Sequence, residues 1–285
     1  MRFSIRSKLI LAIGGPLLLI FLGVIAVDYY RAREAAIGQT QTQLQNQARW
    51  KASLLGTQLQ SVMQLGDQMA EYFGTNPTGR QEAYWRMLRL ALERNRLVYR
   101  VAVAFEPAAG QTSSFSPYIE RRMGKGPDNR RRMTVERGDL KNPTSLTWFR
   151  QAIESQSGYW LTPEMDSQGH PIASYVAPIV DAEGERFGAV RLDADLVLLQ
   201  RYVRQGRGED EDVLLISAEG TLICHPDRSC EMRSSLASLA ESRPGEGWER
   251  LAATVSQRRE GVDRLHMPDG WRWVVQTPVS PTGWT

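Results

Sequence analysis

The sequence predicts an α+β protein that begins with a membrane helix, and three observations carry this prediction. No charged residue occurs from Leu9 to Val27. Residues 31–73 contain no proline and place apolar residues at helical spacing. From residue 97 onward, β-branched and aromatic runs alternate with helical segments and turns. Helices followed by such strands are typical of the α+β class.

The charge-free stretch is long enough for a transmembrane helix. At about 1.5 Å per residue it nearly spans a hydrocarbon core roughly 30 Å thick. Basic residues precede it and an aspartate and two tyrosines follow it, which indicates a cytoplasmic N-terminus: Arg2, Arg6, Lys8, then Asp28, Tyr29 and Tyr30. We expect residues 1–30 to form a single-pass anchor in the inner (plasma) membrane, with the remainder periplasmic or extracellular. A cleaved signal peptide is the alternative, but no A-x-A site follows the stretch.

Composition and charge exclude some functions. The hydrophobic share of 42% and the charged share of 24% are ordinary for a globular protein. The formal net charge is +3, and three basic residues precede the apolar stretch, so the rest of the chain carries no net charge. This balance argues against general nucleic-acid binding.

Residues 31–73 are predicted to form a long stalk helix. The apolar positions Leu55, Leu59, Val62, Met69 and Phe73 follow steps of three, four and seven, whereas alternating glutamines make the first half polar. Such a helix pairs with a second copy as a coiled coil or packs along its own domain. We expect a homodimer in which the first half pairs between subunits and the second half lies on the domain. Gly74 to Gly79 should end the helix.

Residues 74–204 are predicted to form a membrane-distal module. A helix over residues 81–94 precedes a buried strand over residues 97–105. Residues 108–140 are polar and are expected to form a solvated loop with an edge strand at 116–121. The basic residues in this segment fit a solvated surface, with an anion-binding rim as the alternative: Arg121, Arg122, Lys125, Arg130, Arg131 and Arg132.

The stretch from Trp148 to Asp193 is predicted to form the wall of a ligand pocket. It contains a short helix carrying Trp148 and Phe149, an aromatic loop around Trp160, and strands at 172–179 and 187–193. A helix of about ten residues should follow.

Residues 205–285 are predicted to form a smaller, membrane-proximal module. Strands at 212–217 and 221–225 should form a hairpin. Helices are expected at 236–241 and 248–257, followed by strands at 261–266 and 271–276.

Two cysteines, Cys224 and Cys230, occur in this module. An exported compartment permits a disulfide between them, and two free thiols are the alternative. A metal site with His225 would need a further ligand that the sequence does not offer. The chain has no G-x-S-x-G, H-E-x-x-H or P-loop motif, so we expect no catalytic activity and no cofactor.

Two blocks carry a family resemblance. The PI-V-D-x-E-G-x-x-x-G-A-V-x-x-D pattern at 178–193 and the S-x-E-G-T-L-I-x-H-P-D pattern at 217–227 resemble a double Cache domain, an extracytoplasmic sensor of bacterial receptors. The resemblance covers nearly all of residues 31–285. It implies two tandem PAS-like antiparallel-sheet modules, of which the distal one binds ligand. It also implies that the proximal module is incomplete and that a second transmembrane helix would follow.

Three pieces together are most similar to receptors whose effector is a serine/threonine phosphatase of the SpoIIE/RsbU type: the N-terminal RFSIRSKLILAIGGPLLLIFL, the run NRLVYRVAVAFEP and the Trp148 helix. Histidine kinases, chemoreceptors and diguanylate cyclases carry similar sensors. The resemblance therefore implies a sensor of a transmembrane signalling receptor. A membrane-tethered interaction domain without a small ligand is the alternative.

For the ligand site, the resemblance matches Trp148 and Asp193 to the pattern of amino-acid sensors. Three positions depart from that pattern: Leu146 replaces the carboxylate-binding arginine, Phe149 a tyrosine, and Glu164 a second tyrosine. Without the arginine, we do not expect an α-amino acid as the ligand. We predict an acidic and aromatic pocket for an amine, a small organic molecule or a cation. Its predicted residues are Trp148, Phe149, Trp160, Glu164, Asp166, Tyr175 and Asp193.

All of these residues except Glu164 also have a structural interpretation. The aromatic residues also fit core packing between helix and sheet. Asp166 fits the start of a turn, and Asp193 fits the cap of the next helix.

Overall fold

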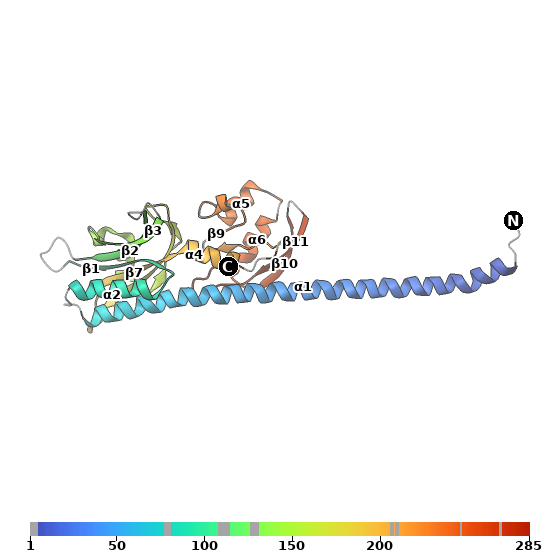
Figure 1. Ribbon diagram of the computed structural model, residues 1–285, viewed down its shortest axis with the longest axis horizontal. Coiled ribbons are helices and arrows are strands. Elements are labelled where there is room, and N and C mark those ends of the chain that lie inside the picture. The colour runs from blue at the N-terminus through green and yellow to red at the C-terminus, as the bar shows by residue number, and fades with distance from the viewer. Residues whose placement is uncertain are drawn as a thin grey trace.

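The computed structural model shows two lobes lying along one side of a single long helix, α1 (Ile5–Thr75) (Figure 1). It describes residues 5–76, 81–107, 115–125, 131–205, 208, 211–245, 247–267 and 270–285. The N-terminal part of α1 extends beyond both lobes, whereas the C-terminus lies beside α1 between them. The predicted stalk is therefore part of one helix that also includes most of the predicted anchor.

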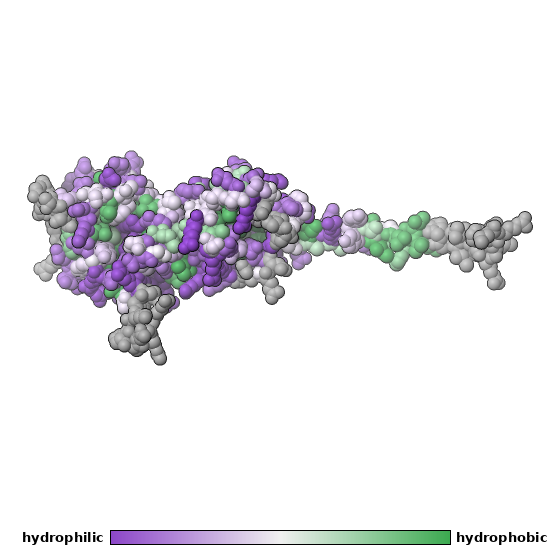
Figure 2. Space-filling model, turned by 90° about the horizontal axis from the view of Figure 1, so that it is seen from above, coloured by the Kyte–Doolittle hydropathy of each residue, from purple (hydrophilic) through white to green (hydrophobic). Residues whose placement is uncertain are grey.

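The N-terminal part of α1 exposes apolar side chains from Leu17 to Val27. They form the green band between the lobes and the grey end of the helix in Figure 2. Residues 1–4, and the side chains of residues 5–16, lie outside the described residues, so half of the predicted anchor falls there. Over the part of the chain that is described, no helix has an apolar stretch sufficient to cross a membrane.

The first lobe is a seven-stranded antiparallel sheet in the order β3-β2-β1-β7-β6-β4, with β5 paired to β6. Its strands are β1 (Val98–Phe105), β2 (Pro117–Lys125), β3 (Arg131–Asp139), β4 (Tyr159–Trp160), β5 (Glu164–Met165), β6 (Pro171–Val180) and β7 (Arg186–Asp195). Its helices are α2 (Gln81–Arg94), the 3-10 turn η1 (Pro143–Ser145) and α3 (Thr147–Glu154). The predicted helix at 81–94 and the three long predicted strands are present within two residues.

The two faces of this sheet pack against different helices. Because side chains alternate along a strand, Tyr175 and Leu192 face α1, whereas Val176 and Ala189 face α3. Gly66 allows the close approach on the α1 side, since a Cβ there would lie 2.8 Å from the Tyr175 ring. The face opposite α1 is therefore the one that α3 partly covers.

The strand predicted at 116–121 is present as the first part of β2, but the loop predicted after it is wrong, since β2 continues to Lys125 and β3 follows at Arg131–Asp139. β2 and β3 form a hairpin in which Glu120 pairs with Glu136 and Arg122 with Thr134. Arg121 turns to the helical side and donates to the carbonyls of Leu92 and Arg96. Charged residues on both faces hid the strand pattern, and two of them, Arg121 and Arg122, have partners within the lobe. Arg130 lies outside the described residues.

Helix α4 (Leu196–Arg204) connects the two lobes and is bonded to three other elements. Asp195 at the end of β7 caps its N-terminus by accepting from the Val197 and Leu198 amides. Gln200 Nε2 donates to the Ile223 carbonyl of the second lobe at 2.7 Å. Lys51 Nζ of α1 donates to the C-terminal carbonyls of Val203 and Gln205 at 2.6 and 2.7 Å.

The second lobe consists of two small hairpins and two helices. Its elements are β8 (Leu215–Ile216), β9 (Leu222–Cys224), the 3-10 turn η2 (Arg228–Cys230), α5 (Leu236–Ser242), α6 (Trp248–Val255), β10 (Gly261–Met267) and β11 (Gly270–Gln276). The terminal Thr285 pairs with Ile216 through two backbone hydrogen bonds. Trp284 contacts Trp160 of the first lobe, with ring centroids 6.3 Å apart. The predicted elements are found, with a shorter β8 and β9.

Of the two alternatives for Cys224 and Cys230, the structure has the free thiols, and both are buried. Cys224 packs in the core shared with α1, whereas Cys230 packs in the separate core of the second lobe. The two side chains therefore point into different clusters. Burial raises the pKa of Cys224 to about 11, so its thiol is protonated at neutral pH.

Candidate functional site

Asp193 of β7 is the centre of a charged cluster on the sheet face opposite α1. Its residue is 0% exposed, and three side chains donate to its carboxylate. Arg191 Nε and Ser174 Oγ each lie 2.7 Å from Oδ1, and Arg100 Nε lies 2.5 Å from Oδ2. The strand register explains this convergence, because Asp193 pairs with Arg100 on one side and Ser174 on the other.

Arg191 joins the buried carboxylate to the surface. Its Nη2 donates to Glu164 Oε1 at 2.8 Å and to Ser174 Oγ at 2.9 Å. Its guanidinium carbon lies 5.8 Å from the ring centroid of Trp148. The aromatic face that we predicted for an organic or cationic ligand is therefore in contact with this arginine.

The cluster continues across the sheet toward β3. Glu120 Oε2 lies 3.7 Å from Arg100 Nη1, and its Oε1 accepts from Arg122 Nε at 2.7 Å. Arg122 Nη1 in turn lies 3.0 Å from Glu136 Oε2. Positive and negative groups alternate along this row, so the acidic character that we predicted for the site is balanced by arginines.

Electrostatics keep Asp193 ionised despite its burial. Burial alone would raise the pKa of Asp193, but the charges of Arg191 and Arg100 and the hydrogen bonds from Arg191 and Ser174 outweigh it. The pKa of Asp193 therefore lies below its ordinary value. Burial opposes the charge on Arg191 too, yet Asp193 and Glu164 raise its pKa. Both groups are charged at neutral pH.

Aromatic residues of α3 pack on the same sheet face as the Asp193 cluster. Trp148 and Phe149 of α3 are buried with Ala104, Val176 and Ala189, and their ring centroids lie 6.1 Å apart. Tyr159 Oη donates to the Trp148 carbonyl at 3.1 Å. Trp148 thus has the core-packing role considered from the sequence and still contacts Arg191.

Three predicted site residues lie elsewhere. Tyr175 is on the α1 side of the sheet, where its hydroxyl donates to Asp67 Oδ1 at 2.6 Å. Trp160 packs on Tyr175 with ring centroids 5.5 Å apart. Asp166 Oδ1 accepts from the amides of Gln168 and His170, both at 2.8 Å, and so closes a turn. The structure therefore brings together Trp148, Phe149, Glu164 and Asp193, but not these three.

Sequence reasoning missed Arg100, Arg191 and Ser174. A signal was present, since an arginine in the middle of the apolar run V-Y-R-V-A-V needs a buried partner. Arg191 likewise stands two residues before Asp193, which puts both side chains on one face of a strand. Neither arginine was assigned a role because arginines are mostly exposed.

A titratable group lies near this cluster, where β7 meets α4. His170 Nε2 lies 3.1 Å from Asp195 Oδ1, and its ring stacks on Tyr99 with centroids 4.3 Å apart. Hydrogen bonding to Asp195 raises the pKa of His170, although burial opposes the shift. Burial, with nearby Asp166 and Glu120, raises the pKa of Tyr99 to about 12.

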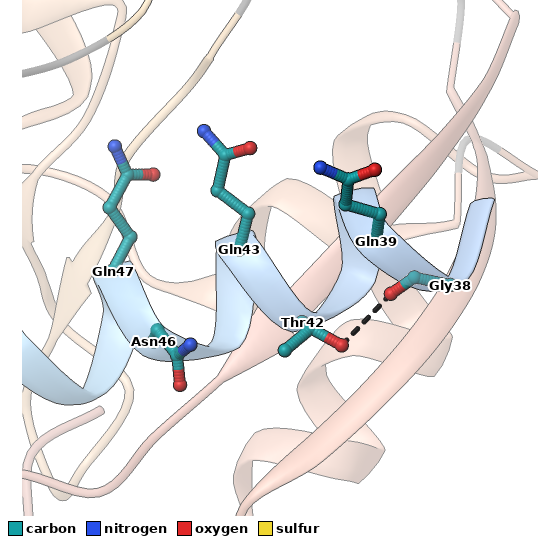
Figure 3. Close-up of a pocket in the computed structure, with 6 residues that line it drawn as sticks. All are labelled: Gly38, Gln39, Thr42, Gln43, Asn46 and Gln47. Carbon is teal, nitrogen blue, oxygen red and sulfur yellow. Dashed lines mark hydrogen bonds between the residues drawn. The ribbon is translucent and has the colours of Figure 1, made fainter. Parts of the chain in front are cut away.

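A polar hollow of about 600 Å³ lies on α1, far along the helix from the first lobe. Figure 3 shows Gln39, Gln43 and Gln47 pointing the same way from successive turns, and Thr42 bonded to the Gly38 carbonyl. Every lining residue comes from α1, so the hollow is a one-sided helix surface. Among the described residues, no three histidine, cysteine or acidic side chains are grouped as metal ligands.

Comparisons with known proteins agree on the fold. Residues 84–201 match the family model described as methyl-accepting chemotaxis protein-like, first PDC sensor domain. No curated protein matches the chain. The matched segment includes the seven-stranded sheet and the Asp193 cluster.

Solved structures extend the similarity to both lobes. The extracellular domain of mmHK1S-Z2, described as a histidine kinase, has a TM-score of 0.69 at 17% identity, covering 85% of this chain and 93% of that one. The ligand-binding domain of the Pseudomonas aeruginosa amino acid chemoreceptor PctC, in complex with GABA, has a TM-score of 0.62 at 18% identity, with 86% and 96% covered. The ligand-binding domain of the Pseudomonas fluorescens chemoreceptor CtaA, in complex with L-alanine, has a TM-score of 0.56 at 20% identity. The match covers 85% of this chain and 93% of that one.

The chain therefore has the fold of the extracellular sensor domains of chemoreceptors and histidine kinases. The double Cache resemblance is confirmed at the level of the fold.

Proposed function

We propose that this chain is the extracytoplasmic ligand-sensing part of a transmembrane signalling receptor, and that its small-molecule site is the Arg100–Asp193–Arg191 cluster. The observation that carries the proposal is a fully buried aspartate held by two arginines on the sheet face opposite α1. Such an arrangement costs desolvation and is weak evidence for a stabilising role. A binding role gives the arginines a purpose, because each has a further nitrogen beyond the one that Asp193 occupies.

The site is connected to the helix that leaves the lobes. Asp193 is two residues from Asp195, the cap of α4, and Lys51 of α1 caps the other end of α4. A ligand that moves β7 would therefore shift α4 against α1. The ligand would favour one of two arrangements of these helices, and the difference in its affinity for the two would set the size of the signal.

We propose that residues 9–27 anchor the receptor in the membrane and that α1 pairs with a second copy. Apolar side chains are exposed between Leu17 and Val27, as expected of a lipid-facing segment. Further along α1, Trp50 is 58% exposed on the polar stalk. A large exposed aromatic on a helix surface favours burial in a homodimer. The ligand-binding module would comprise residues 74–204 and the second module residues 205–285.

A thermal-shift screen of the purified chain tests the ligand-sensing function. The panel contains carboxylates, amines, amino acids, sugars and divalent cations, and Arg191→Lys is the matched variant. A ligand at about a hundred times its Kd should stabilise the folded state by roughly 2.7 kcal/mol, and the shift should shrink in the variant. No shift from any class, beside an intact fold, would contradict the proposal.

A ligand-free interaction domain is the second candidate. It is favoured by the pairing within the cluster, where Arg191 already covers the Trp148 ring and contacts Glu164. In that case a partner protein would supply the signal, and the screen would give no shift.

We further propose that the receptor controls a cytoplasmic effector. The sequence resemblance favours a serine/threonine phosphatase of the SpoIIE/RsbU type over a kinase or a cyclase. Phosphatase assays on the full-length receptor would test it, and absence of activity would contradict it.

A further inference from the structure

The two sides of the Arg191 guanidinium have different partners. Nε faces Asp193, which is 0% exposed, whereas Nη2 faces Glu164, whose side chain is 53% exposed. The Arg191 side chain is 11% exposed, but the Glu164 end of this pair is open to water and salt, which compete with it. A buried charge pair with further hydrogen bonds is costly to break. Arg191 is therefore fixed by Asp193 and exchangeable at Glu164.

Asp193 is poorly suited to receive a ligand ammonium group. Its two oxygens already accept from Arg191, Ser174 and Arg100, and the residue has no exposed surface. An amine would have to displace a charged, hydrogen-bonded guanidinium from a buried site. This removes the main argument for an amine or cation at this position.

Glu164 shows which chemistry the outer side of Arg191 accepts. Its carboxylate lies 2.8 Å from Nη2, and it comes from β5, a strand of only two residues that pairs with β6. Arginine presents several donors in a plane, a geometry that matches carboxylate and phosphate oxygens. The group now bound there is a carboxylate from the chain itself.

We propose that the ligand of this site is a small carboxylate, and that Glu164 competes with it for Arg191. The inference rests on the proposed sensing function and names its ligand class. The ligand needs no amino group, since Asp193 is saturated by the protein. Binding of the ligand carboxylate would release Glu164 and β5 from Arg191, while Asp193 keeps the guanidinium in place.

Isothermal titration calorimetry on the purified chain tests the ligand class with four probes: propionate, 4-aminobutyrate, propylamine and inorganic phosphate. We expect the two carboxylates to bind and propylamine not to bind, and we expect phosphate, whose oxygens also match the arginine, to bind no more tightly than propionate. Binding of propylamine or phosphate without propionate would overturn the carboxylate assignment, yet leave the sensing function standing. If none of the four binds but another class shifts the melting temperature in the screen above, the assignment again fails alone.

Two variants test the role of Glu164. Glu164→Ala should tighten propionate binding about two- to fivefold, because a carboxylate open to water is a weak competitor. Glu260→Ala is the matched control, since Glu260 of the second lobe is similarly exposed and is bonded to Arg49 of α1, and it should not change propionate binding. Arg191→Lys, which keeps the charge but loses the planar fork, should weaken binding at least about tenfold. Unchanged or weaker binding in Glu164→Ala would overturn the competition.

Discussion

Arg191 Nε and Asp193 Oδ1 lie 2.7 Å apart on one face of β7, two residues from each other along the strand. Arg100 of β1 reaches the same carboxylate from the neighbouring strand. The pairing is thus built from the register of three strands, and its stability depends on the buried aspartate.

Removal of the Asp193 carboxylate should destabilise the first lobe strongly. Asp193→Ala leaves Arg191 and Arg100 close together without their shared anion, and breaking a buried ion pair costs about 3–5 kcal/mol. Urea denaturation of the purified chain measures the change. Glu164→Ala, on the exposed side of Arg191, should change the free energy of unfolding by under about 1 kcal/mol. Equal effects of the two variants would contradict this hierarchy.

Stability should fall as the pH rises past neutrality because of His170. Its pKa is raised by Asp195, and Asp166 adds to the shift, so protonated His170 stabilises the folded chain. That contribution is fully present below the unfolded pKa of about 6.5 and is lost as the pH rises through the folded pKa. Melting temperatures from pH 6 to pH 9 should decline more in the wild type than in His170→Gln. Parallel curves would show that the ion pair contributes nothing.

Lys51 should matter far more than its neighbour Arg49. Lys51→Met leaves the carbonyls of Val203 and Gln205 without their donor, which should cost about 1–3 kcal/mol. Arg49→Met removes an exposed pair with Glu260 and should have little effect. Chemical denaturation measures the free energy of unfolding of both variants. If Lys51→Met leaves it unchanged, the bonds from Lys51 to the end of α4 do not link α1 to the lobes.

Alanine substitutions at two glycines of α1 should change the stability of the chain in opposite directions. A Cβ at Gly56 would lie 2.6 Å from the Ser280 carbonyl oxygen, so Gly56→Ala should force the second lobe away from α1 at about 1–3 kcal/mol. Gly38 has no atom within 4 Å of such a Cβ, and Gly38→Ala should stabilise the helix by about 0.5–1 kcal/mol. Thermal unfolding of the two variants checks the signs. Stabilisation by both would mean that the lobe does not pack closely on α1.

The main elements were predictable because their apolar periodicity is strong. The helix at 81–94, the strands at 97–105 and 172–179, and the hairpin at 261–276 agree with the structure within two residues. Of the β2–β3 hairpin, only the first part of β2 was predicted, as an edge strand at 116–121, since charged residues leave no apolar alternation in the rest.

The site was predictable only in part. Asp193, Glu164 and Trp148 came from a family pattern, whereas Arg100 and Arg191 required the strand register. Strand parity alone separates Tyr175 from Ser174, because adjacent residues face opposite sides of a sheet. The register across strands, which sets the partners of Asp193, is a long-range property that a local pattern does not contain.

Hydrogen exchange with and without ligand tests the location of the site most directly. The ligand would be the compound that gives the largest thermal shift in the screen, measured by peptide-resolved mass spectrometry on the purified chain. We predict that protection increases in β5, β6, β7 and α4, around Arg191 and Asp193. Protection confined to residues 211–285, or to none of the chain despite a thermal shift, would contradict a ligand site at the Asp193 cluster.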